Sequence, residues 1–158
     1  MTDYCIVVAN GARARIYALE HPAQPEFESG PDLVEVQTLA SPEHAARDRA
    51  VYTDQITGRN RRPTTGGHDY DEHRDAHDDE VEKRFARDIA EAMRVQGTRH
   101  NVLCADSRML GFMREALAAA GGPDVAEVAH DYTSLSARDL QARLAEARLA
   151  PARRAPGG

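Results

Sequence analysis

The sequence lacks tryptophan, and its 158 residues include only three phenylalanines, five tyrosines and two cysteines. Two cysteines without metal-ligand spacing argue against a disulfide framework, so we expect free, buried thiols at Cys5 and Cys104. No apolar run approaches the roughly 18 residues that a membrane span needs. The start also lacks a basic segment followed by an apolar one, so no secretory signal is visible. We therefore expect a cytoplasmic protein without a membrane span.

An excess of positive charge is also missing. Twenty basic residues stand against 26 acidic ones, which gives a formal net charge of −6. This balance argues against nucleic-acid binding through the whole surface and leaves only local basic patches. The length suits a single domain, which we assign to residues 1–150, and the Pro/Gly/Arg-rich residues 151–158 are predicted to be a disordered tail.

Hydrophobic patterning predicts strands first and then alternating helices and strands. The first strand is an apolar, β-branched run (YCIVVA), and Asn10-Gly11 after it is typical of a hairpin turn. Helix caps are predicted at Asp106 or Ser107 and at Ser136, and helix stops at Gly97 and Gly121. The predicted strands are residues 4–9, 13–19, 33–39, 101–105 and 125–129, and the helices begin near residues 78, 107 and 137.

This succession predicts an α/β fold with a five-stranded mixed sheet, β-β-β-α-β-α-β-α, and right-handed crossovers. It is the element order of ribonuclease H-like folds, in which the first strand lies centrally beside the fourth. Cys5 and Cys104 would then be neighbours in the sheet. The central strands carry no carboxylates, which argues against a metal-dependent nuclease, and apolar surroundings disfavour a thiolate nucleophile.

In residues 40–77 the apolar residues follow neither a helix nor a strand period. A connection of this length inside a domain is usually functional or mobile. Its first part is basic and its second part is strongly acidic. Arginine is a forked, permanently charged donor that suits phosphate contacts. The alternative is a solvated loop in which the basic and acidic parts pair with each other. The candidate binding arginines are Arg47, Arg49, Arg59, Arg61 and Arg62.

The glycine pair Gly66-Gly67 precedes His68 at the end of this connector. A loop of this kind can present backbone N–H groups and an imidazole to a substrate or an RNA backbone, or it can be an ordinary turn into a helix. His68 is the one candidate catalytic residue, as a general base. His73 and His77 are weak metal-ligand candidates that match no recognised zinc spacing, so we expect no metal and no cofactor.

The chain resembles the bacterial host attachment protein family over most of its length. The resemblance rests on residues 7–9 and 12–17 (VVA, ARARIY), on Pro42-Glu43 and the spaced residues 47–59 of the connector, on residues 82–87 (EKRFAR) and on residues 131–136 (DYTSLS). This family is in turn similar to the middle domain of archaeal and eukaryotic class 1 translation release factors. In those factors a Gly-Gly-Gln loop before a long helix reaches the peptidyl transferase centre.

Gly66, Gly67 and His68 stand at the comparable point of this sequence, with His68 in place of the glutamine and acidic residues after it. The resemblance therefore implies a binding module associated with ribosomes or structured RNA, and we expect it to be non-enzymatic. One alternative is a protein–protein interaction factor that supports attachment to host cells. The other is a hydrolase that uses His68.

Overall fold

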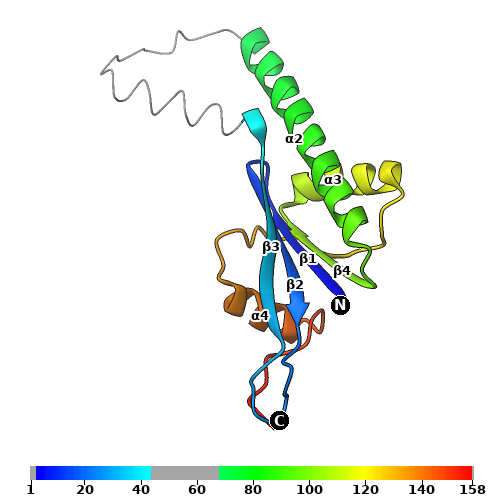
Figure 1. The fold of residues 1–158 in the computed structure, drawn as a ribbon. Helices are drawn as coiled ribbons and strands as arrows, with labels where there is room; N and C mark the ends of the chain where they lie inside the picture. Colours follow the sequence, from blue (N-terminus) through cyan, green and yellow to red (C-terminus); the bar gives the residue numbers. More distant parts are fainter. Residues whose placement is uncertain (1–2, 44–67, 158) are drawn as a thin grey trace.

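The chain forms one open sheet with helices on both faces, in a computed structural model that describes residues 3–43 and 68–157 (Figure 1). Three strands come first, and helices then alternate with two further strands, which confirms the predicted element order. The elements are β1 (Tyr4–Ala9), β2 (Arg13–Glu20), β3 (Asp32–Ala40), α2 (His68–Gln96), β4 (His100–Ala105), α3 (Ser107–Ala120), β5 (Ala126–Val128) and α4 (Ala137–Glu146).

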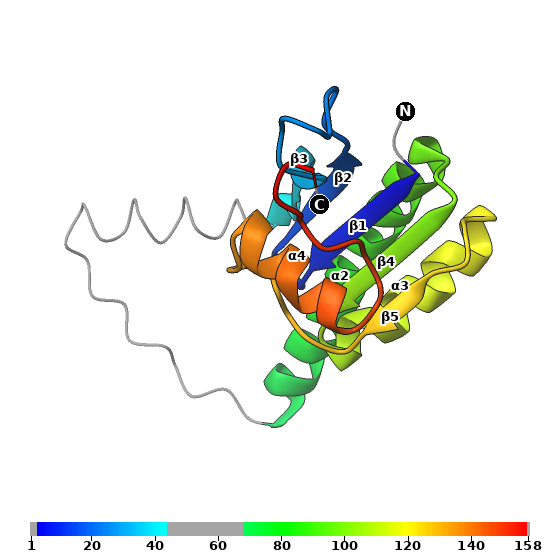
Figure 2. The same ribbon diagram turned by 90° about the horizontal axis from the view of Figure 1, so that it is seen from below.

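The sheet is mixed, with the strand order β3-β2-β1-β4-β5. The meander β1-β2-β3 is antiparallel, whereas β1 runs parallel to β4 and β4 runs parallel to β5. The central position of β1 beside β4 is therefore as predicted. Figure 2 shows α4 on one face of the sheet, with α2 and α3 on the other.

The core has two halves that share β1, because this strand is buried on both of its faces. Cys5, Val7 and Ala9 pack toward α2 and α3. Ile6 and Val8 pack toward α4. A continuous apolar run is the pattern expected of a strand that is covered on both sides, and it fixes β1 at the centre of the fold.

Cys5 and Cys104 lie on neighbouring strands, but the expectation that they are neighbours in the sheet is wrong. In the parallel register of β1 and β4, Cys5 is opposite Asn101, and Cys104 is opposite Val8. Successive side chains of a strand point to opposite faces, and the register offset is an odd number of residues. Cys5 therefore faces α2 and α3 while Cys104 faces α4, and both are free.

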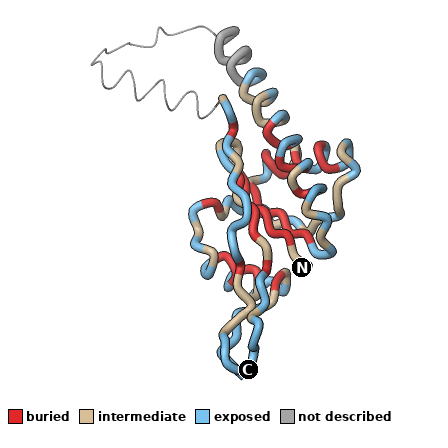
Figure 3. The backbone as a smooth tube through the Cα atoms, viewed as in Figure 1, coloured by how far each residue is buried: buried red, intermediate tan, exposed pale blue. Residues whose placement is uncertain are grey.

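Helix α2 begins about ten residues before its predicted start and spans 29 residues, from His68 to Gln96. No glycine or proline interrupts these residues, and acidic residues near a helix N-terminus interact favourably with the helix dipole. The helix ends before Gly97, whose φ of 59° confirms the predicted stop. Its first turns extend beyond the sheet (Figure 1), and Phe85 is the first buried residue of α2 among those whose burial is described. Figure 3 shows that buried residues follow in the part of α2 that lies over the sheet.

The later helices have the predicted caps. The Asp106 carboxylate accepts a hydrogen bond from the N–H of Met109, and the Ser136 hydroxyl accepts one from the N–H of Asp139 at 3.1 Å. Gly121 ends α3 with a φ of 64°, in the left-handed region that favours glycine. These local signals set where α3 begins and ends and where α4 begins.

The end of the chain differs from the predicted disordered tail. Residues 151–157 lie against the connection between β2 and β3, where Gly30 and Arg154 exchange two backbone hydrogen bonds of 2.9 Å. The Arg153 guanidinium also pairs with Asp32 at 2.7 Å. Composition predicts that such a segment cannot build a core, but it does not reveal that another loop satisfies its backbone polar groups.

Candidate functional site

The turn between β1 and β2 is tied to a distant loop by one amide side chain. The Asn10 side-chain oxygen accepts hydrogen bonds from the N–H groups of Ala12 and Arg13 at 2.8 and 2.9 Å. The Asn10 Nδ2 donates to Asp131 Oδ2 at 3.0 Å and to Thr133 Oγ1 at 3.2 Å. Asn10 therefore joins the end of the central strand to the loop that precedes α4.

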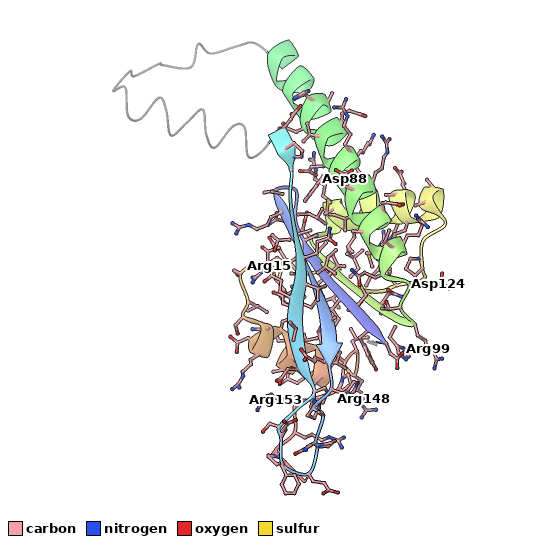
Figure 4. All side chains as sticks on the ribbon, in the orientation of Figure 1. Arg15, Asp88, Arg99, Asp124, Arg148 and Arg153 are labelled. Carbon is pink, nitrogen blue, oxygen red and sulfur yellow. The ribbon has the colours of Figure 1, made fainter. Side chains whose placement is uncertain are left out.

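The loop before α4 contributes further hydrogen bonds to this network. The Thr133 N–H and hydroxyl donate to Asp131 Oδ1 at 2.9 and 2.6 Å, and Arg15 donates to the Thr133 carbonyl at 3.1 Å. Arg15, labelled in Figure 4, also pairs with Glu35 at 2.7 Å. Burial raises the pKa of Asp131, but the hydrogen bonds from Thr133 and Asn10 and the nearby Arg13 charge hold it below its usual value. These hydrogen bonds hold the turn between β1 and β2 against the loop before α4. We call the network of Asn10, Asp131 and Thr133 the clamp.

A groove lies on the other side of the same turn, between the end of β3 and α2. We call it the α2–β3 groove. It consists of two adjoining hollows of about 370 and 390 Å³, which share Ser41, Glu43 and Val81. The first is further lined by Pro42, Arg84, Phe85, Arg87 and Asp88, and the second by Asn10, Gly11, Ala12, Asp78, Glu82 and Arg108.

Acidic side chains dominate the second hollow. Arg108 pairs with Asp79 and, at 2.8 Å, with Glu82. Across the groove, Glu43 pairs with His77 at 2.9 Å, which joins the end of β3 to α2. The carboxylates Glu43, Asp78, Asp79 and Glu82 thus surround one permanently charged cation, so this end of the groove has a negative field.

Ser41 lies at the meeting point of the two hollows. Its N–H donates to the Ala12 carbonyl at 2.9 Å, and its side chain is 0% exposed. The Ser41 hydroxyl has no hydrogen-bond partner among the residues that the structure describes. Buried hydroxyls without a partner are uncommon and call for an explanation.

The two cysteines do not supply a nucleophile. Burial raises the pKa of Cys5 to about 11, against a smaller lowering effect of a hydrogen bond with Thr98. Burial raises the pKa of Cys104 to about 12. Both thiols are therefore protonated at neutral pH, as their apolar strands predict.

Most of the site residues predicted from the sequence lie outside the described residues. This applies to Gly66, Gly67 and the arginines of the connector. His68 and His73 belong to α2, in its first turns, where the structure describes the backbone only. His77 pairs with Glu43. In residues 3–43 and 68–157, no three His, Cys, Asp or Glu side chains are arranged to hold a metal ion.

The structure also brings together residues that the sequence did not single out as a site. Asn10 was predicted only as a turn residue, and Asp131 and Thr133 only as part of a shared motif. Glu82 was predicted only as part of the EKRFAR motif, and Ser41 and Arg108 carried no signal of their own, because the three meet through the packing of α2 against α3 and the end of β3. The signals that pointed to this region are the shared motifs: DYTSLS for the Asn10 network, and Pro42-Glu43 with EKRFAR for the groove.

Comparison with known proteins identifies one family. The family model described as "Protein required for attachment to host cells" matches residues 5–144. No curated protein matches the chain. Within the described residues, no helix combines the length and apolar character needed to cross a membrane.

Proposed function

The chain belongs to the family of proteins required for attachment to host cells, and from this premise we propose that it is a non-enzymatic binding module that associates with ribosomes or structured RNA. We further propose that its fold is ribonuclease H-like and similar to the middle domain of class 1 release factors. The strand order β3-β2-β1-β4-β5, with a central β1 parallel to β4, supports this assignment of the fold.

The observation that carries the proposal is the position of the glycine pair relative to α2. His68 is the first residue of the helix, so Gly66-Gly67 comes directly before it in the sequence. From His68 to His77, which pairs with Glu43, α2 extends about 14 Å at about 1.5 Å per residue. A glycine pair at the start of a long helix that extends beyond the domain is the arrangement that a release-factor-like contact requires.

The acidic residues of α2 oppose contact with an RNA backbone, but part of their charge is neutralised. Arg108 forms ion pairs with Asp79 and Glu82 and also interacts with Asp78. We assign the phosphate contacts to the connector arginines, because each guanidinium presents a fork of N–H donors that suits a phosphate.

Ribosome co-sedimentation over a range of salt concentrations tests the proposal. We expect the wild-type protein to sediment with ribosomes at low salt and to be released as salt rises. An Arg59/Arg61/Arg62→Ala variant should be released at lower salt, with the slope of log K against log salt reduced by about two to three. An Arg99/Arg138/Arg148→Ala variant, which removes the same charge from elsewhere, should behave like the wild type.

Two results would reject the assignment. If the wild-type protein is absent from the ribosomal fraction even at low salt, the ribosome is not the partner, and a structured RNA must be tested by the same salt titration. If both triple variants lose binding equally, the connector is not the contact surface, because general charge would then explain the association.

A further inference from the structure

The α2–β3 groove is a second candidate binding surface, made entirely of described residues and independent of ribosome association. Its two hollows of about 370 and 390 Å³ adjoin at Ser41, Glu43 and Val81. Each is within the range of small-ligand sites. Because the two hollows share lining residues, two side chains of one bound peptide can occupy them together.

The two hollows differ in chemistry. The first has an apolar wall of Pro42, Val81 and Phe85. Its four charged side chains are balanced, two acidic and two basic: Glu43, Asp88, Arg84 and Arg87.

The second hollow has three acidic side chains, Glu43, Asp78 and Glu82, against Arg108 alone, and Arg108 also pairs with Asp79 at its margin. A ligand that matches both halves has an apolar group beside a cationic one.

Ser41 supplies an observation independent of the acidic residues. It lies where the two hollows meet, it is fully buried, and its hydroxyl lacks a partner among the described residues. A hydroxyl rotates and can either donate or accept a hydrogen bond. A peptide with one side chain in each hollow has backbone amides between these two side chains, and a backbone amide can pair with a hydroxyl.

We infer that the α2–β3 groove binds a short segment of a partner protein in which an arginine or lysine adjoins an apolar side chain. The cationic group enters the hollow of Glu43, Asp78 and Glu82, and the apolar group packs on Val81 and Phe85. The Ser41 hydroxyl bonds to the backbone between them. A nucleic acid does not fit this hollow, because its phosphates would face an excess of carboxylates.

The test is a titration of the full chain with a fluorescent capped peptide, acetyl-Leu-Arg-Leu-Arg-amide, followed by anisotropy. The matched probe replaces both arginines by glutamates and should not bind. A Glu43→Gln/Glu82→Gln variant keeps the size of both side chains but loses their charge, and its thermal unfolding midpoint is measured beside its affinity because both residues also form ion pairs within the protein. It should bind the arginine peptide about tenfold more weakly, because two partly screened charge contacts are lost. A Glu115→Gln/Glu146→Gln variant removes the same charge from exposed sites on α3 and α4 and should bind like the wild type.

Ser41→Ala separates binding from folding. Because the hydroxyl has no partner among the described residues, its removal should leave the thermal unfolding midpoint unchanged or slightly higher. The same variant should bind the arginine peptide about threefold more weakly, the loss expected for one hydrogen bond of modest net strength. A loss of stability with unchanged affinity would show that the hydroxyl is structural and would overturn its assigned role.

Three other outcomes overturn the inference. Equal binding of the arginine and glutamate peptides would show that the groove does not select charge. Direct binding of a labelled RNA oligonucleotide that Ser41→Ala weakens would assign the surface to nucleic acid. A gain of tenfold or more in affinity when all five connector arginines are changed to serine would show that the connector of the same chain occupies the groove.

Discussion

Replacement of Asn10 by alanine tests the clamp at the end of the central strand. The substitution removes four hydrogen bonds, two accepted from the Ala12 and Arg13 N–H groups and two donated to Asp131 and Thr133. Each such bond contributes about 0.5–1.5 kcal/mol net, and water replaces part of this contribution at a half-exposed site. We therefore expect a loss of about 2–4 kcal/mol in the free energy of unfolding, measured by urea titration at pH 7.

Asn10→Asp sharpens this test. The aspartate keeps the acceptor for the two backbone N–H groups but loses the donor, and it places a second carboxylate near Asp131. We expect a cost comparable to that of alanine at pH 7, because like charges at this distance repel. The cost should fall as the pH is lowered, since protonation of one carboxylate restores a donor.

The control is Gln37→Ala, which removes an exposed amide from β3 and should change the free energy of unfolding by less than about 0.5 kcal/mol. If Asn10→Ala costs no more than this control, the Asn10 hydrogen bonds do not hold the loop. If Asn10→Asp is as stable as the wild type at neutral pH, the proposed contact between residue 10 and Asp131 is wrong.

Three further predictions concern the thiols, the close approach of the turn to α2, and pH. Cys5 and Cys104 have pKa values raised to about 11 and about 12, so neither should react with iodoacetamide at pH 8 until urea unfolds the protein, as mass spectrometry would show. A Cβ on Gly11 would lie 2.5 Å from the Glu82 carboxylate, so Gly11→Ala should cost about 1 kcal/mol by displacing that side chain, and the cost should vanish in a Glu82→Ala background. The pKa of Asp131 is lowered from its ordinary value of 3.8, so its carboxylate stabilises the fold fully above pH 3.8, and this stabilisation is lost as the pH falls below that value. Asp131→Asn should flatten the dependence of the unfolding free energy on pH in that range. An unchanged pH profile would contradict this.

The sequence predicted the features of the fold that depend on local patterns. The apolar run of β1, the cap at Ser136 and the left-handed glycines at the ends of α2 and α3 all follow from interactions within a few residues. The predicted start of α2, near residue 78, is about ten residues too late. The acidic residues before that position predict a segment that precedes the helix, but they form its first turns. Periodicity marks only the part of a helix that packs on a core.

The candidate site was much less predictable. Asn10 and Asp131 are 121 positions apart, and Arg108 and Asp79 are 29 apart. Pairings of this kind depend on the strand order and on which face each helix covers, and no local pattern carries that information. The offset between Cys5 and Cys104 shows the same limit, because the neighbouring strands were identified but their register was not.

The contact between Glu43 and His77 has a consequence for how the chain can vary. It joins two side chains 34 positions apart at 2.9 Å, one just past the end of β3 and the other in α2. The contact therefore holds together two residues that stand on either side of residues 44–67 in the sequence. The entropic cost of closing a loop rises only slowly with the number of residues in the loop. A change in the number of residues between positions 44 and 67 should therefore leave the sheet, the Asn10–Asp131–Thr133 network and the α2–β3 groove intact.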